Sequence, residues 1–214
     1  MNIKRRLSKR SSDTVYSMEF SEKLKLIDAT KKGTSDMIDE LEKFIKGMND
    51  NNAANRFEKP GEKCRAYARV CTDEAARAGF DTMKKVFGKI GRLHRLFSNE
   101  VKERCIVPMK EWLRADYKRM KAEVEKLNEL RNAMDNASNE SRHHPNNLIL
   151  EQKHSEAEGA HQAQMGVMEE RVFKKLYEDH EKLARIWKRF MEMEVNLYQE
   201  VRNCIEEAII NIQT

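Results

Sequence analysis

Two runs of basic residues in this 214-residue sequence have the spacing of a helical face. No acidic residue lies between Asp81 and Glu100, and three bases of that interval follow in steps of four and three: Lys85, Lys89 and Arg92. A second run follows in steps of four, four and three: Lys110, Arg114, Lys118 and Lys121. Residues at such steps share one face of a helix. Each run therefore predicts a stripe of positive charge, which an anionic membrane attracts with about 1 kcal/mol per base. The alternative is a solvated face that serves solubility.

The first ten residues contain five more bases and no acid: Lys4, Arg5, Arg6, Lys9 and Arg10. With three apolar residues they could form a short amphipathic helix on a membrane. The apolar face is thin, so we favour a disordered basic arm over residues 1–12. Ser8 follows two arginines at a spacing that basophilic kinases use, and its phosphorylation would weaken attachment to an anionic surface. A nuclear-localisation signal is the other interpretation of this arm.

Catalytic and metal-binding patterns are missing from the sequence. It has no Walker loop, GxSxG, HExxH or glycine-rich nucleotide fingerprint, so we expect neither enzymatic activity nor a cofactor. The four cysteines form no CxxC pair and are expected to be ordinary thiols. His143 and His144 lack the converging spacing of a metal site. We interpret them as exposed loop residues, with a gain of positive charge below about pH 6.5 as the alternative.

The composition favours long solvated helices over a compact globular core. Charged residues make up 36% of the chain, which has only 8 Gly and 3 Pro. The formal net charge is +5, which is only mildly basic. No apolar run approaches the roughly 20 residues that cross a bilayer. No signal peptide is visible either, so we expect a cytoplasmic protein.

Apolar residues that recur in alternating steps of four and three predict three long amphipathic helices. We expect them from the N-cap cluster Ser11-Ser12-Asp13 to about Asn51-Asn52, from about Glu62 to about Asn136, and from about Leu148 to about Ile210. Residues 136–147 are expected to form a loop, and Val195 is among the predicted buried positions of the third helix. Pro108 should kink or split the second helix. Such rods must bury their apolar stripes against one another and against a second copy.

The segment from Glu100 to Asp135 carries a more specific signal. It combines a Glu-Val-Lys start with Pro108-Met109, Asp116, Lys118, Lys126-Leu127, Arg131 and Asp135. In these residues the chain resembles the endophilin-type N-BAR members of the BAR domain family. Weaker similarity extends to Ile27–Thr30, to Gly61-Glu62 with Tyr67, and to Leu183–Tyr198.

The resemblance implies an all-α BAR domain over residues 13–214. Its protomers would have three long kinked antiparallel helices and would form a crescent-shaped homodimer, a six-helix bundle that binds curved anionic membranes. A bend at Pro108 could aim both basic stripes at one concave surface. Endophilin-type domains have a lysine-rich distal tip, and the nearest bases to that position here are Arg142 and Lys153.

The favoured interpretation is a cytoplasmic, peripheral membrane protein whose dimer senses or induces curvature on anionic phospholipid membranes. One alternative is a BAR-type adaptor that binds a small GTPase, as some relatives in that family do. Another is a coiled-coil scaffold that does not contact lipid. Nucleic-acid binding is disfavoured, because the basic stripes lack interleaved exposed aromatic residues and any reading motif.

Overall fold

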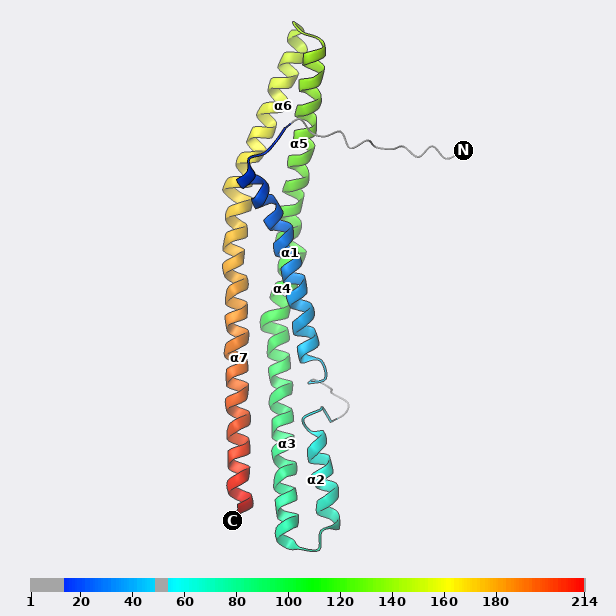
Figure 1. The fold of residues 1–214 in the computed structure, drawn as a ribbon, viewed down its shortest axis with the longest axis vertical. Coiled ribbons are helices and arrows are strands. Elements are labelled where there is room, and N and C mark those ends of the chain that lie inside the picture. Colours follow the sequence, from blue (N-terminus) through cyan, green and yellow to red (C-terminus); the bar gives the residue numbers. More distant parts are fainter. Residues whose placement is uncertain (1–13, 49–53, 214) are drawn as a thin grey trace, which may run out of the picture. The chain divides into compact units, whose positions relative to one another are not determined.

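The structure, a computed structural model, describes residues 14–48 and 54–213 of the chain. These residues are helical nearly throughout and include no strand (Figure 1). Three π-helical segments, η1 to η3, lead directly from one α-helix into the next. The elements are α1 (Met18–Ile45), α2 (Lys59–Val70), α3 (Glu74–Val101), η1 (Lys102–Ile106), α4 (Val107–Trp112), η2 (Leu113–Tyr117), α5 (Lys118–His143), α6 (Leu148–Val167), η3 (Met168–Phe173) and α7 (Lys174–Gln213). The predicted all-helical fold class is confirmed.

The predicted number of three long helices is wrong, because residues 71–73 interrupt the second one. Cys71 and Asp73 have extended backbone conformations between α2 and α3. The Asp73 carboxylate accepts a hydrogen bond of 2.7 Å from the N–H of Ala76 and so caps the start of α3. Aspartate is a favoured N-cap residue, and the heptad interpretation overlooked this signal. The described residues form four helical segments: α1, α2, α3 to α5, and α6 to α7.

Two predicted helix ends also move. The first helix ends at Ile45, and Gly47 follows with φ +80°, the left-handed conformation that commonly terminates helices. The positions predicted for its N-cap and its end, Ser11–Asp13 and Asn51-Asn52, lie outside the described residues. The predicted loop over 136–147 is too long, because α5 continues to His143 and buries Ala137. Only residues 144–147 connect α5 to α6, and Asn147 caps α6 by accepting from the N–H of Ile149 at 3.1 Å.

Pro108 does not split the helical segment in which it lies. The π-helical segment η1 precedes it, and Pro108 occupies the first turn of α4. Because η1 continues directly into α4, Pro108 removes one backbone donor from a continuous helical segment. Extra residues accommodated in a π-helical turn are one recognised cause of helix bending. The kink expected at Pro108 therefore stays a prediction.

The chain forms two compact units. Unit 1 comprises the described residues up to 32 and residues 114–179. In it, α5 and α6 form a helical hairpin, and the first part of α1 packs through Phe20, whose ring meets Phe173 edge-on at 5.3 Å. Its most deeply buried apolar side chains are Ile27, Leu127, Met168, Phe173 and Leu176.

Unit 2 comprises residues 33–113 and 180–214 as far as they are described. Its core is built from the second part of α1, from α3 to α4 and from α7, with these buried residues: Ile38, Leu41, Met48, Phe97, Val101, Cys105, Ile106, Met109, Leu183, Phe190, Met193 and Leu197. The short helix α2 packs along α3. Gly61 makes this approach possible, because a Cβ there would lie 2.9 Å from the Cβ of Phe87.

A buried asparagine fixes the chain just before α2. Asn55 is 2% exposed, and its amide nitrogen donates to the carbonyls of Met48 at 3.1 Å and of Gly91 at 3.0 Å. Its amide oxygen accepts from the backbone N–H groups of Phe57 and Glu58. All of these bonds go to main-chain groups, so the position of α2 on α3 is set by backbone geometry.

Candidate functional site

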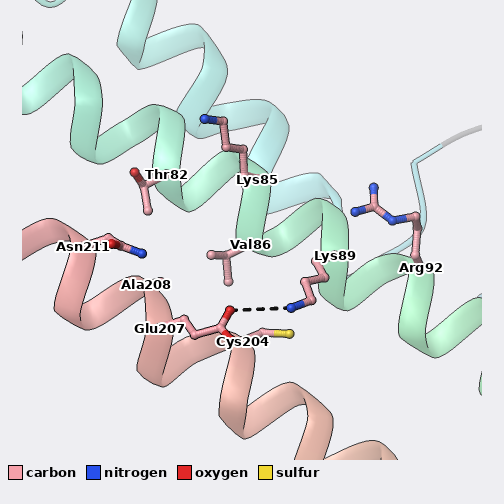
Figure 2. Close-up of a pocket in the computed structure, with 9 residues that line it drawn as sticks. All are labelled: Thr82, Lys85, Val86, Lys89, Arg92, Cys204, Glu207, Ala208 and Asn211. Atoms are coloured by element: carbon pink, nitrogen blue, oxygen red, sulfur yellow. Dashed lines mark ion pairs between the residues drawn. The ribbon is translucent and has the colours of Figure 1, made fainter.

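The first basic run lies along α3 and lines an open groove in unit 2. The groove lies between α3 and α7 (Figure 2). It has a volume of about 490 Å³. Lys85, Lys89 and Arg92, all exposed, contribute to its wall. The other lining residues are Thr82, Val86, Cys204, Glu207, Ala208 and Asn211.

The three bases of this run differ in how much of their charge is compensated. Lys89 points toward α7, where its Nζ lies 3.6 Å from the Glu207 carboxylate (Figure 2). The neighbouring Cys204 thiol and the Glu207 carboxylate hold the pKa of Lys89 above its usual range. Lys85 and Arg92 extend from α3 on the side away from Glu207 and form no ion pair with any described residue. Their charge is therefore available to an external anion, whereas Glu207 offsets that of Lys89.

The second basic run is divided between the two units. Lys110 lies in unit 2, and its Nζ is 2.6 Å from the carboxylate of Glu42. Arg114, Lys118 and Lys121 belong to unit 1. Exposed Arg114 has an interaction partner, and Lys121 pairs with Asp28 at 3.6 Å. Lys118 is exposed and has no ion-pair partner among the described residues.

The bases near the α5–α6 connection are also partly compensated. Lys153 pairs with Glu140 at 2.7 Å, and the hydrogen bond from Lys153 lowers the pKa of the Glu140 carboxyl. Arg142 is exposed and has a partner within the described residues. Leu148 and Ile149, at the start of α6, are 78% and 77% exposed. Sequence reasoning missed this apolar pair, whose signal was two adjacent aliphatic residues directly after a turn.

A second surface that sequence reasoning missed runs along α7 in unit 2. Its residues follow in steps of three and four. All but one are large hydrophobic side chains that are at least 41% exposed, and the other is an exposed arginine: Met191, Val195, Tyr198, Arg202, Ile205, Ile209 and Ile212. The predicted burial of Val195 is wrong within the protomer, because 53% of it is exposed. The core face of the same helix is formed by Phe190, Met193 and Leu197 instead. We call the exposed series the α7 stripe.

The chain that leads into α1 is attached to unit 1 by polar contacts. The Thr14 hydroxyl donates to Asp135 at 2.5 Å, and the Tyr16 hydroxyl lies 3.2 Å from Nε2 of His161. The Tyr16 ring stacks on the His161 ring, with the two ring centroids 5.9 Å apart. The Arg131 guanidinium lies over the Tyr16 ring, 5.3 Å from its centroid. The N-terminal bases Lys4, Arg5, Arg6, Lys9 and Arg10 and the candidate phosphosite Ser8 lie outside the described residues.

Other kinds of site find no support in the described part of the chain. It contains no group of three or more His, Cys, Asp and Glu side chains that could hold a metal ion. Among its helices, none is sufficiently long and apolar to pass through a bilayer. The charge-bearing surfaces on α3 and α5 and the apolar α7 stripe are thus its most distinctive external features.

The described residues thus define an all-helical protein with long helical segments. The family model of the BAR domain matches residues 7–214, so the chain belongs to the BAR domain family. A comparison with curated proteins found no match. BAR domains are generally non-enzymatic scaffolds that dimerise and associate peripherally with membranes. The family expected from Glu100–Asp135 is therefore confirmed, while the endophilin-type assignment stays a prediction.

Proposed function

We propose that this chain is an endophilin-type BAR domain of the cytoplasm whose homodimer binds anionic phospholipid membranes and senses or induces their curvature. The family match supports membrane association and dimerisation in general terms. For this chain in particular, the proposal is carried by the exposed bases that have no ion-pair partner among the described residues: Lys85, Arg92 and Lys118.

The α7 stripe supports dimerisation through a second copy of this chain. A surface helix of a soluble protein normally has one apolar face, and α7 has a second one beside its core face. Contiguous exposed apolar patches mark interaction sites. The stripe keeps the helix-packing steps of three and four, so another helix with the same steps could interdigitate with it. A two-fold axis would supply such a helix from the partner's own α7.

The membrane contribution can be sized from the unpaired bases. Each base near an anionic leaflet is worth about 1 kcal/mol. A dimer presents Lys85, Arg92 and Lys118 twice, which gives roughly 6 kcal/mol before any contribution from other residues. A stiff crescent that bends at Pro108 would bring all of these charges to the bilayer at once only when the two curvatures match. This dependence on shape is how such a protein would sense or induce curvature.

The test is cosedimentation with anionic and neutral vesicles of several diameters, followed by electron microscopy for tubules. We expect binding to anionic vesicles, preference for one range of diameters, and loss of binding as salt screens the charges. Lys118→Gln removes two unpaired charges per dimer and should weaken binding roughly 30-fold. The matched control is Lys121→Gln with Asp28→Asn, which removes a neighbouring base without changing the net charge. Equal effects of these two variants, or equal binding to neutral vesicles, would contradict the proposed surface.

Vesicle binding, together with a binding assay for a small GTPase, separates the alternatives. A lipid-independent scaffold would not bind anionic vesicles even at low salt. An adaptor for a small GTPase would bind its partner according to nucleotide state and regardless of lipid charge. Either result would replace the membrane proposal.

We also propose that residues 1–12 act as a basic arm that adds to membrane attachment. Five bases in this segment have no acid among them to offset their charge: Lys4, Arg5, Arg6, Lys9 and Arg10. Deletion of the arm should weaken vesicle binding, and Ser8→Glu should weaken it by placing a negative charge among these bases. If the arm folds as an amphipathic helix, vesicles will raise the helical circular dichroism of the full chain but not of the deletion variant.

A further inference from the structure

The segment of chain that precedes α1 in unit 1 alternates between inward and outward side chains. Thr14 and Tyr16 are partly buried against the α5–α6 hairpin, whereas Val15 between them is 89% exposed. Residues of alternating orientation are typical of an extended chain that lies on a surface. The contacts described for this segment are made by its side chains: Thr14 bonds to Asp135, and Tyr16 lies between His161 and Arg131.

We propose that these contacts form an acid-labile latch, which holds the root of the N-terminal arm on the α5–α6 hairpin while His161 is neutral and releases it when His161 is protonated. The Tyr16 ring packs on the His161 ring, which is 4% exposed, so a protonated His161 would hold its charge in a site closed to water. Release of Tyr16 would expose the imidazolium to water, and protonation therefore favours the released segment.

The charges that face His161 decide the direction of the effect. They come from the segment before α1, which contributes Tyr16, and from α5, which contributes Arg131 and Asp135. Burial of the ring, which is 4% exposed, is the largest cause and lowers the pKa of His161 below its usual value of 6.5. Arg131 acts in the same direction, and Asp135 opposes both. Thr14 donates to this same Asp135 carboxylate.

The sign of the pH dependence follows from this shift. Because the pKa is lowered in the latched state, the released state takes up the proton more readily. The latch is therefore at full strength above pH 6.5 and weakens as the pH falls below that value.

The consequence for membrane attachment rests on the proposed function of the arm. Residues 14–17 join the arm to α1, which begins at Met18. Four residues in an extended chain span about 13 Å. Release of the latch would lengthen the reach of the arm by about this distance while α1 stays in place. An acidic environment would thus let the basic arm contact a bilayer surface farther from its point of attachment.

The latch can be tested without any membrane. A nitroxide label at Val15→Cys points away from the latch and reports the motion of the segment by electron paramagnetic resonance. Cys64→Ser and Cys71→Ser remove the two cysteines that are partly accessible, since Cys105 and Cys204 are buried. We expect the label to become at least threefold more mobile between pH 7.5 and pH 5. A label at Ser155→Cys on exposed α6, together with unchanged helical circular dichroism, controls for general unfolding.

Two variants separate the latch from other effects of acid. His161→Gln retains groups that accept and donate hydrogen bonds but does not titrate, so the label should stay immobile at both pH values. Tyr16→Phe removes the hydroxyl and should leave the label mobile at both. Equal mobility of the wild-type label at pH 7.5 and pH 5, or an unchanged acid response in His161→Gln, would overturn the proposal. Failure to bind vesicles would instead refute the proposed function and leave these results intact.

Discussion

Truncation of two isoleucines on the α7 stripe offers the sharpest test of self-association. Ile205 and Ile209 are 44% and 50% exposed in the protomer, so about half of each side chain is available to a partner. An Ile→Ala change removes three carbon groups, and each buried group is worth about 0.8 kcal/mol. The half that is covered on association therefore contributes about 1.2 kcal/mol per side chain.

A symmetric dimer contains both residues twice. Ile205→Ala with Ile209→Ala should accordingly cost about 5 kcal/mol of association free energy, which raises the Kd by three to four orders of magnitude. Sedimentation velocity over a wide range of concentrations measures this shift directly. The matched control is Asn196→Ala with Asn203→Ala, two exposed positions of α7 outside the stripe.

Circular dichroism at high protein concentration should show that both variants keep their helices. If the isoleucine variant associates as tightly as the control, the α7 stripe is not the interface, and our reasoning from its exposure and spacing is refuted.

Three further outcomes are expected from the packing of unit 2. Gly91→Ala should destabilise the fold by about 1–3 kcal/mol in urea unfolding, because a Cβ at this position would lie 2.1 Å from Cγ of Glu58. In the control Gly79→Ala, the added Cβ meets nothing within 4 Å, so this change should stabilise the fold by up to about 1 kcal/mol. Met109→Ala should cost about 2–5 kcal/mol and lower the Tm, because Met109 is completely buried; a loss below 1 kcal/mol would mean that the cavity collapses. Burial lowers the pKa of His94, so the urea midpoint should fall as the pH drops below 6.5, and a constant midpoint from pH 7.5 to pH 5 would contradict this sign.

The fold class and the family could be predicted because both depend on repeated or closely spaced residues. Steps of four and three predicted helices, and Glu100–Asp135 indicated the BAR domain family. The break before α3 was missed because it depends on a single local competitor, the Asp73 cap, which outweighs helix continuation at that point. The end of α5 was predicted too early, because the burial of Ala137 in the tertiary structure outweighs the polar character of its neighbours and the helix continues to His143.

The candidate site was predictable only in part, for a different reason. Helical spacing places Lys118 and Lys121 near each other, but it does not reveal that Asp28 from α1 forms an ion pair with Lys121 and not with Lys118. Spacing also predicts that α7 has apolar positions without dividing them into a buried face and an exposed stripe. Both distinctions depend on contacts between segments far apart in the sequence, which a periodic pattern does not encode.

The Asn55 side chain has a consequence for how the α2–α3 hairpin opens. One amide binds the carbonyls of Met48 and Gly91 and two N–H groups at the start of α2, so it joins three stretches of chain at one point. A shift of α2 by one residue along α3 would carry Asn55 with it and break the bonds to Met48 and Gly91 together, at a cost of roughly 1 kcal/mol each. The first step of sliding therefore loses both bonds at once, which favours this single register.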